Sequence, residues 1–289
     1  MEFSGSMVEF LENKSILVTG STGFLGKVFV EKLLRVQPNV KHLFLPLRAL
    51  DQKSASQRLH NEVLGKEVFS VLRSKYGSRF NSFISGKLTP IAGDVALQNF
   101  GLADDSDLLD KLLKEVDIVA HFAATAKFDE RYDVALQTNT IGAKNVLEFA
   151  KKCVKLEMFV HISTAYVCGE KSGVVLEKPF KMCETLETTT IVLDIEEELK
   201  LAQSHLKELM VAEVSEKVEK DAMAVFGMQR ARLFGWPNTY VFTKAMGEML
   251  IGKLGENVPV VIIRPTIVTG TYKEPFPGWS EDVRYCNSK

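Results

Sequence analysis

A short apolar strand that runs directly into a glycine-spaced turn and then a helix is the feature that most restricts the fold of this chain. Ser15–Thr19 has the continuous apolar and β-branched character of a buried strand. Phe24–Val36 follows it and repeats apolar residues at helical spacing. A strand, a glycine-rich turn and a helix in this order are typical of the first βα unit of a dinucleotide-binding sheet.

The turn has the sequence Thr19-Gly20-Ser21-Thr22-Gly23-Phe24-Leu25-Gly26. Gly20 permits a tight turn, Gly23 removes a side chain that would keep a diphosphate from the backbone, and Gly26 lets the helix pack closely on the strand. The helix N-terminus adds free N–H groups and the positive end of its dipole. We therefore predict a dinucleotide site here, with a purely structural turn as the alternative. The expected coenzyme contacts are Thr19, Gly20, Thr22, Gly23, Phe24, Leu25 and Gly26.

Further short apolar runs alternate with helical patterns along the chain. Strands are expected at Lys41–Leu47, Leu88–Ala92, Asp117–Phe122, Met158–Ile162 and Val258–Ile263. Helices are expected at Ser54–Arg73, Asp105–Glu115, Asn139–Lys152 and Thr239–Lys253. Because the apolar runs are continuous rather than alternating, both faces of the strands are expected to be covered. The order predicts an α/β fold with a doubly wound, parallel Rossmann-type sheet and right-handed crossovers.

The segment Glu184–Trp236 departs from this alternation and is expected to insert two amphipathic helices before the helix at 239–253. Two interpretations stay open: a solvated helical insertion, or part of a wall around a long substrate at the C-terminal edge of the sheet. The expected organisation is a leader at 1–12, one dinucleotide-binding domain at 13–279 that includes the insertion at 184–236, and a tail at 280–289.

Composition and charge narrow the function. Lys and Arg number 36 against 37 Asp and Glu, so the chain lacks the broad positive field that attracts nucleic acid, and no nucleic-acid partner is expected. The four cysteines form no CxxC pair and no zinc spacing, which predicts reduced intracellular thiols and no metal site. The first residues lack the features of a signal or transit peptide, and the longest apolar runs are too short to span a bilayer.

The end of the second strand favours one coenzyme over the other. NAD-binding folds of this kind carry an acidic residue there, which binds the ribose 2′-hydroxyl. Here the sequence is Leu45-Pro46-Leu47-Arg48, with no acidic residue before Asp51. The planar guanidinium of Arg48 can pair with a 2′-phosphate, so we predict NADPH, with an arginine that faces solvent as the alternative.

The ends of the third and fourth strands supply further candidate coenzyme contacts. Asp94, with Val95 beside it, follows the third strand, where a carboxylate can accept a hydrogen bond from the adenine amino group. Ala123, Ala124 and Thr125 end the fourth strand with small residues, which suits close approach of a coenzyme. Both segments could instead be plain strand ends.

Tyr240 and Lys244 form a Tyr-x-x-x-Lys pair, the candidate for proton transfer. On a helix the two side chains share one face, and an ammonium beside a phenol lowers the phenol's pKa from its usual value of about 10. Tyr240 is expected to protonate a substrate oxygen as hydride arrives on its carbon, and Lys244 to bond the nicotinamide ribose. Ser163 and Thr164 follow the strand at 158–162 and are expected to donate to the developing oxyanion, with turn capping as the alternative.

Together these motifs resemble those of an extended short-chain dehydrogenase/reductase. Arg264-Pro265-Thr266-Ile267-Val268 resembles the Arg-Pro segment of that group and adds Pro265 to the candidate coenzyme contacts. Longer motifs make the chain similar to the plant fatty acyl-CoA reductases over nearly all of residues 7 to 279. These motifs are Phe128–Tyr132, His161–Val167, Gly235–Tyr240 and Pro275–Trp279.

The resemblance implies NADPH-dependent reduction of a long-chain acyl-CoA to a primary fatty alcohol. Two hydride transfers would be needed, the first giving a hemithioacetal that loses CoA and the second reducing the resulting aldehyde. Tyr240 would be the acid, Lys244 its partner, and Thr164 the hydroxyl donor with Ser163 as the alternative. Asn139 resembles a structural asparagine that supports a proton relay. The resemblance also implies a role in wax, suberin or pollen-wall lipids, and a cytoplasmic location or peripheral association with the endoplasmic reticulum.

Two departures from the family pattern leave other functions open. Pro46 stands in the second strand, where the family carries an aliphatic residue. After Trp279 the sequence leaves the pattern, whereas family members continue into a C-terminal helical domain, so a form truncated before that domain is expected. One alternative is therefore a catalytically silent coenzyme-binding protein that pairs with full-length reductases. Another is a different extended-branch enzyme, such as a sugar-nucleotide epimerase.

Overall fold

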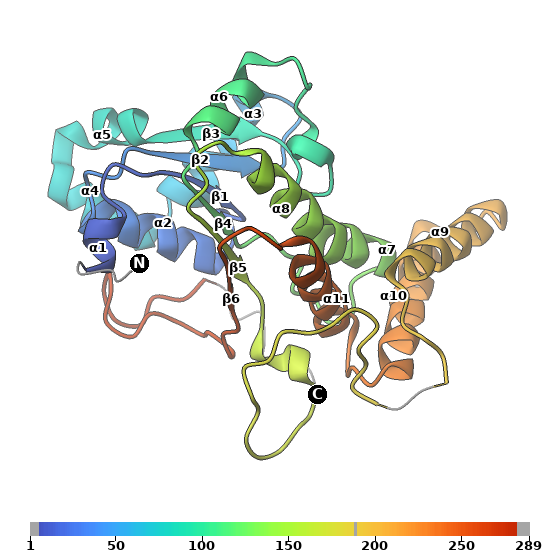
Figure 1. Ribbon diagram of the computed structural model, residues 1–289. Coiled ribbons are helices and arrows are strands. Elements are labelled where there is room, and N and C mark those ends of the chain that lie inside the picture. The colour runs from blue at the N-terminus through green and yellow to red at the C-terminus, as the bar shows by residue number, and fades with distance from the viewer. Residues whose placement is uncertain (1–5, 188–189, 282–289) are drawn as a thin grey trace. The chain divides into compact units, whose positions relative to one another are not determined.

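The strand β1 (Ser15–Thr19) lies inside a six-stranded sheet in the computed structural model, which describes residues 6–187 and 190–281 (Figure 1). The sheet order is β3–β2–β1–β4–β5–β6. The remaining strands are β2 (His42–Leu47), β3 (Leu88–Ala92), β4 (Ile118–His121), β5 (Met158–Ile162) and β6 (Val260–Ile263). This order is that of the doubly wound dinucleotide-binding fold, so the predicted parallel Rossmann-type sheet is confirmed.

The register of the first strands explains why their sequences are apolar throughout. Ile16 of β1 lies opposite Leu43 of β2 on one side and Ile118 of β4 on the other, and both pairings are parallel. All five residues of β1 are buried. A strand with a neighbour on each side and both faces covered has no solvent-facing position, which is why its apolar run is continuous.

Helices connect these strands and include the two predicted within the insertion. The α-helices are α1 (Met7–Phe10), α2 (Phe24–Val36), α3 (Gln52–Arg58), α4 (Ser70–Tyr76), α5 (Phe80–Lys87), α6 (Asp107–Glu115), α7 (Tyr132–Ala135), α8 (Gly142–Lys152), α9 (Ile195–Val211), α10 (Glu216–Leu233) and α11 (Thr239–Leu254). Short turns of other helical types are η1 (Leu59–Leu64), η2 (Glu67–Phe69), η3 (Gly77–Arg79), η4 (Gln98–Gly101), η5 (Leu136–Ile141) and η6 (Ala165–Cys168). The inserted helices α9 and α10 begin at side-chain caps from Asp194 and Ser215.

The chain divides into two compact units. The first unit is drawn from Met1–Ala123, Phe149–Val160 and Ile267–Lys289, and the second from Ala124–Glu148 and His161–Thr266. The first unit therefore contains the glycine turn, and the second contains the Tyr-x-x-x-Lys helix α11. Each unit has its own hydrophobic core.

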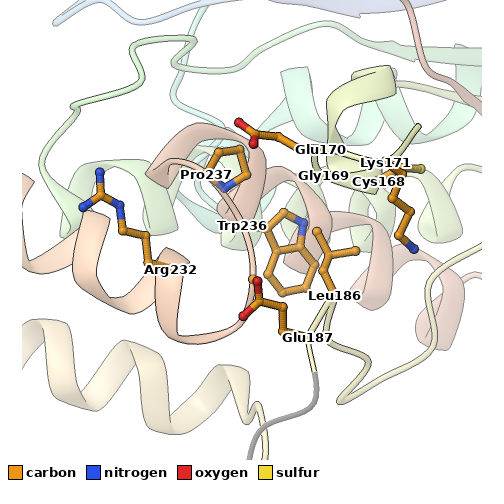
Figure 2. Close-up of a pocket in the computed structure, with 10 residues that line it drawn as sticks. Cys168, Gly169, Glu170, Lys171, Leu186, Glu187, Arg232, Trp236 and Pro237 are labelled. Atoms are coloured by element: carbon orange, nitrogen blue, oxygen red, sulfur yellow. The ribbon is translucent and has the colours of Figure 1, made fainter.

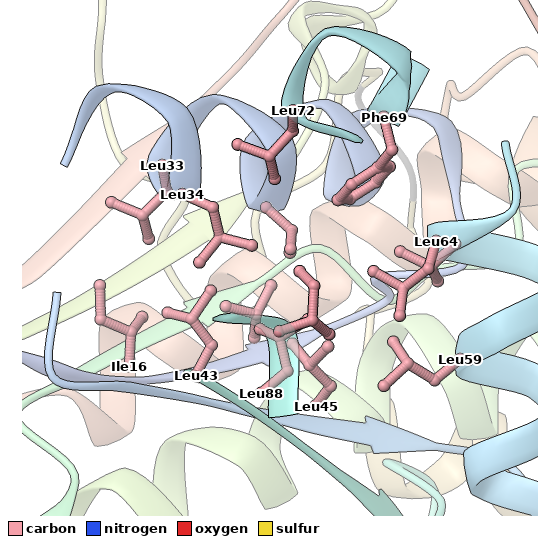
Figure 3. Close-up of a cluster of buried hydrophobic side chains, with 14 of the residues drawn as sticks. Ile16, Leu33, Leu34, Leu43, Leu45, Leu59, Leu64, Phe69, Leu72 and Leu88 are labelled. Carbon is pink, nitrogen blue, oxygen red and sulfur yellow. The ribbon is translucent and has the colours of Figure 1, made fainter. Parts of the chain in front are cut away.

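The core of the first unit lies between the strands and the helices that cover them (Figure 3). Leu33 and Leu34 of α2 face Ile16 and Leu43 of the sheet, and all four side chains are almost completely buried. Burial of a leucine side chain contributes about 2 kcal/mol. This packing holds α2 firmly on the sheet, and the glycine turn is the N-terminal end of that helix.

The core of the second unit is aromatic and surrounds α11. Phe242 of α11 packs between Trp236 and Phe234, with ring centroids 5.2 and 5.6 Å away. Trp236 is fully buried, and its indole N–H donates to the Val167 carbonyl at 2.8 Å. The segment that precedes α11 is thereby fixed, which sets where the helix begins.

The structure departs from the predicted helices between β2 and β3. The single helix expected at Ser54–Arg73 is wrong, because the chain forms α3, the π-helical turn η1, η2 and α4 in its place. Gly65 ends η1 by donating its N–H to the His60 carbonyl at 2.7 Å, and a glycine is a weak helix former. Helix α5, which follows, was not predicted.

Pro46 is accommodated in β2 although that strand is not at the edge of the sheet. On the β3 side Pro46 lies opposite Ile91, whereas the pairs with β1 run from Ser15↔His42 to Leu17↔Phe44. Pro46 therefore lies beyond the stretch where β2 pairs with β1, and its missing N–H removes no bond there.

The structure describes only parts of the leader and the tail that were expected on either side of the domain. In the expected leader, Ser6 caps α1, and Phe10 and Leu11 pack against the first core. Residues 1–5 of that leader and residues 282–289 of the expected tail lie outside the described residues.

Candidate active site

The glycine turn between β1 and α2 is closely packed at two of its glycines. Gly20 has a φ of +70°, and a Cβ atom built there would lie 2.5 Å from the backbone nitrogen of Ala123. A Cβ on Gly26 would lie 2.3 Å from the Gly20 carbonyl oxygen. Both distances are far inside van der Waals contact, so only glycine permits this turn at either position.

Gly23 differs from these two because it faces outward at the N-cap of α2. Its φ of −79° is open to any residue, and its nearest neighbour for a built Cβ is the Gly20 carbonyl oxygen at 3.2 Å. No side chain of the described residues caps α2. The N-terminal N–H groups of a helix are left for an anion when no side chain caps them, so the turn fits a diphosphate.

Thr19 links the turn to the end of β4. Its Oγ1 lies 2.7 Å from Nδ1 of His121 and accepts the Ala123 N–H at 3.2 Å. The sequence analysis assigned Ala123 to the coenzyme. The buried contact between His121 and Thr19 holds the two strand ends at the turn together.

Arg48 and Asp94 line one cavity of about 400 Å³ in the first unit. Arg48 follows β2 and is exposed, whereas Asp94 follows β3 and is half-buried. The Gly93 N–H donates to the Leu47 carbonyl at 3.0 Å and so ties the two strand ends. Val95 is buried at 8% exposure. The two residues predicted from separate strand ends are thus brought together.

In the second unit, α11 carries the candidate proton-transfer pair. Asn238 caps this helix by accepting the Val241 N–H at 3.0 Å, so the helix begins just before Tyr240. Lys244 is 1% exposed, and its Nζ donates to the Ile162 carbonyl at 2.7 Å. The lysine ammonium is therefore fixed at the end of β5, one helical turn after Tyr240.

A buried histidine also contacts this lysine. Nε2 of His161 lies 3.2 Å from Nζ of Lys244, and His161 is fully buried. An ammonium has only donors, so Nε2 is the acceptor in this contact. Sequence reasoning missed this role, because a lone histidine before a strand end carries no signal of its partner.

Burial lowers the pKa of Lys244 from 10.5 to about 8, and the negative charge of Glu248 partly opposes that effect. Glu248 is itself buried and pairs with Arg264, whose Nε donates to Oε1 at 3.0 Å. Arg264 also donates to the Lys178 carbonyl at 3.0 Å. Arg264 of the Arg-Pro segment is thus the ion-pair partner of Glu248, and the carboxylate of Glu248 is the negative charge that favours the ammonium of Lys244. With a pKa of about 8, Lys244 stays mostly protonated at neutral pH.

The two candidate hydroxyl donors, Thr164 and Ser163, differ in their hydrogen bonding. Thr164 is 5% exposed, and its Oγ1 accepts the Tyr166 N–H at 3.3 Å as the cap of η6. Ser163 is 4% exposed, and its Oγ has no hydrogen-bond partner among residues 6–187 and 190–281. Pro265 lies beside them, because its carbonyl accepts the Ala165 N–H at 2.9 Å. A hydroxyl that accepts can still donate, so both residues keep a free O–H.

Asn139 lies in the π-helical turn η5 and connects two further candidates. Its Oδ1 accepts the Thr125 N–H at 3.0 Å, and its Nδ2 donates to the Thr125 carbonyl and to Oγ1 of Thr243, also at 3.0 Å. The side chain of Thr125 donates to Glu130 at 3.0 Å. Asn139 therefore fixes the backbone after the exposed Ala124 against α11.

Phe128 stacks on Tyr240, with ring centroids 6.2 Å apart and an interplanar angle of 25°. Phe128 remains 47% exposed. The sequence marked Phe128 only as part of a family motif. In the structure it restricts the orientation of the phenol ring.

A cavity of about 430 Å³ lies within the second unit (Figure 2). Leu186, Trp236 and Pro237 give it apolar walls. Its charged lining residues are two basic and two acidic ones, Lys171, Arg232, Glu170 and Glu187. Pro237 precedes Tyr240 by three residues, and Cys168 on the lining follows Thr164 by four. The segments that carry the candidate site residues therefore also build this cavity.

Comparison with known families places the chain. The model of an NAD-binding domain, described as male sterility protein, matches residues 18–288. This chain belongs to the male sterility protein family. A nicotinamide coenzyme is thus the class of cofactor that the match supports.

Curated relatives of this family member are named as reductases. Fatty acyl-CoA reductase 8 of Arabidopsis thaliana is 54% identical over 289 residues, which is 100% of this chain and 58% of the relative. An alcohol-forming fatty acyl-CoA reductase of Simmondsia chinensis is 55% identical over 284 residues, covering 98% of this chain and 57% of the relative. Fatty acyl-CoA reductase 2 of Homo sapiens is 32% identical over 286 residues, covering 98% and 48%. The chain spans about half the length of these relatives.

Solved structures support the fold of this family member. The reductase domain of a nonribosomal peptide synthetase from Mycobacterium tuberculosis has a TM-score of 0.57 and 21% identity, covering 90% of this chain and 50% of that one. The terminal R domain from the myxalamid pathway has a TM-score of 0.57 and 20% identity, with the same coverage. In the described part of the chain, no helix combines the length and apolar character needed to cross a membrane.

Proposed function

We propose that this chain is the NADPH-dependent reductase part of an enzyme that converts long-chain acyl-CoA to a primary fatty alcohol. The observation that carries the proposal is the buried Lys244, held by the Ile162 carbonyl and His161 one turn after Tyr240. A buried lysine with fixed acceptors has little structural value, because burial opposes its charge. Such a lysine can serve the reaction when a phenol lies on the same face of its helix, because the ammonium stabilises the phenolate.

The coenzyme is proposed to bind through residues of the first unit. The turn from Thr19 to Gly26 would hold the diphosphate, with the N–H groups of Phe24 and Leu25 as donors, because the Gly23 N–H donates to the Gly20 carbonyl at 3.0 Å. Arg48 would pair with the 2′-phosphate and Asp94 with the adenine amino group, since both line one cavity. Val95 and Ala123 complete the proposed contacts of this unit. Ala124, Thr125 and Pro265 belong to the second unit, and their coenzyme contacts stay predictions. When bound, NADPH supplies hydride.

Residues of the second unit are proposed to transfer the proton to the substrate. Tyr240 donates to the substrate oxygen, Lys244 stabilises the phenolate left behind, and Thr164 or Ser163 donates a hydrogen bond to that oxygen. Each reduction uses one hydride and one proton. Two such steps, with loss of CoA thiol between them, convert the thioester to the alcohol.

The second-unit cavity is proposed to take part of the acyl-CoA. Its apolar walls of Leu186, Trp236 and Pro237 suit a hydrocarbon chain. We also propose peripheral association with the endoplasmic reticulum, which the exposed apolar side chains of Val174, Val175 and Leu176 favour. We propose in addition that this chain can pair with a full-length reductase.

Product analysis tests the proposed function. The purified 289-residue chain is incubated with NADPH and palmitoyl-CoA, and lipids are analysed by gas chromatography. We expect hexadecanol or hexadecanal in the extract. A chain that binds NADPH yet forms neither product would instead be the catalytically silent alternative.

Replacing Arg48 with Ala tests the choice of coenzyme. We expect the KM for NADPH to rise at least about tenfold and that for NADH to change by less than about twofold, because only NADPH carries the 2′-phosphate. Arg79→Ala, at an exposed arginine of the same unit, is the matched control and should change neither. Equal effects of Arg48→Ala on both coenzymes would refute the assignment.

The rate should fall as pH rises through about 8, because the ammonium form of Lys244 is present below its pKa of about 8 and lost above it. His161→Leu removes a neutral acceptor of that ammonium, which lowers the pKa further and moves the fall in kcat to lower pH. His161→Gln keeps an acceptor oxygen and should move it less. Profiles of kcat against pH that coincide for all three proteins would show that His161 does not act on Lys244.

A further inference from the structure

Residues 271–281, which we call the α2 strap, lie along α2 in the first unit (Figure 1). The strap is closed at its base by Thr271. The Thr271 N–H donates to the Trp279 carbonyl at 2.9 Å, and Oγ1 of Thr271 accepts the Trp279 N–H at 3.0 Å. The strap contains the Pro275–Trp279 motif that the sequence singled out, and the proposed chemistry gives that motif no role.

One anchor of the strap lies on the C-terminal half of α2. Glu274 pairs with Lys32 and with Arg35, whose Nη2 donates to it at 2.7 Å. Hydrogen bonds from these residues lower the pKa of Glu274 to about 2. All three side chains are partly exposed, so this anchor contributes little to stability.

The other two anchors contact the first turn of α2. The Trp279 ring stacks on Phe24 with centroids 5.1 Å apart and an interplanar angle of 8°. Glu281 forms an ion pair with Lys27. Phe24 is the first residue of α2 and Lys27 the fourth, so the two contacts bracket the turn that offers its N–H groups to the diphosphate.

Each contact stabilises a residue of that turn: the ion pair compensates the buried charge of Lys27, and the stack orders the side chain of Phe24. Lys27 is 2% exposed, and burial lowers its pKa while Glu281 opposes that effect. A buried cation in the first turn is also repelled by the positive end of the helix dipole, so it needs a counter-charge. Phe24 follows Gly23, an N-cap residue that has no side chain to cap the helix, and the stack on Trp279 restricts the side chain of Phe24. Trp279 itself is 6% exposed.

We propose that the α2 strap holds the first turn of α2 in its diphosphate-binding conformation, with Trp279 as the positioning residue. The proposal rests on the proposed coenzyme site in the turn. It makes coenzyme affinity depend on a residue that follows β6 in sequence and belongs to no part of the turn itself.

Isothermal titration of NADPH into the purified chain tests the proposal. Trp279→Leu keeps an apolar side chain but removes the stack, and the Kd should rise about tenfold. Trp279→Phe restores an aromatic ring and should stay within about twofold of the wild type, as should Glu274→Gln, which loosens the strap away from the turn. Thermal unfolding of each variant establishes that it is folded.

The outcomes separate this proposal from the proposed function. If the wild-type chain does not bind NADPH, the coenzyme site itself is refuted. If the wild type binds and Trp279→Leu binds equally well, or Glu274→Gln weakens binding as much, only the role of Trp279 is overturned. Should Trp279→Leu fail to fold, Glu281→Gln decides: weaker NADPH binding supports the proposal and unchanged binding overturns it.

Discussion

Replacing Tyr240 with Phe is expected to lower kcat for acyl-CoA reduction by at least about 100-fold while NADPH affinity changes by less than about twofold. The substitution removes only the phenol oxygen, which is the proposed proton donor. The ring that stacks on Phe128 is kept, so α11 and its surroundings should be unchanged. Steady-state kinetics for the rate and calorimetric titration for NADPH binding give the two quantities.

Phe128→Leu is the matched control for this substitution. It removes the stacking partner of Tyr240 and leaves the phenol O–H in place. We expect a loss in kcat of about tenfold or less, since an aromatic pair is worth about 1 kcal/mol. A Tyr240→Phe protein that kept the wild-type rate would exclude Tyr240 as the acid.

Replacing Gly23 with Ala is expected to weaken NADPH binding by at least about tenfold without unfolding the chain. The backbone at Gly23 has a φ of −79°, which alanine adopts without strain. The new Cβ would lie 3.2 Å from the Gly20 carbonyl oxygen, so the turn accommodates alanine once that oxygen shifts by a few tenths of an ångström. The added methyl group nevertheless occupies the open face of the turn, where a diphosphate would approach the backbone.

Gly86→Ala in α5 is the control for Gly23→Ala. A Cβ built on Gly86 meets nothing within 4 Å, and alanine favours a helix, so neither NADPH affinity nor stability should fall. Calorimetric titration and thermal unfolding of the two variants test the pair. Unchanged NADPH affinity in a folded Gly23→Ala protein would remove the turn from the coenzyme site.

Much of the fold was predictable because its signals are local. The strands of the sheet are mostly apolar runs, and Gly20 and Gly26 of the first turn stand where contacts with Ala123 and with the Gly20 carbonyl exclude a side chain. The shared location of Arg48 and Asp94 could also be predicted from the sequence. Each directly follows a strand, and the ends of parallel strands meet at one edge of a sheet.

Other parts of the candidate site depend on contacts that local sequence does not encode. His161 becomes important only because Lys244, 83 residues later, lies against it. The stack of Phe24 on Trp279 likewise joins residues near opposite ends of the chain. The break at Gly65 was missed for a different reason, since one glycine in a helical pattern is a weak signal.

The most direct test of the central claim uses NADPH labelled with deuterium at the transferable position of C4. The purified chain is incubated with this coenzyme and palmitoyl-CoA, and the product is analysed by mass spectrometry. We expect hexadecanol with two deuterium atoms on C1, or hexadecanal with one, and neither product from the Tyr240→Phe protein. A wild-type product without deuterium, or equal labelled product from both proteins, would contradict it.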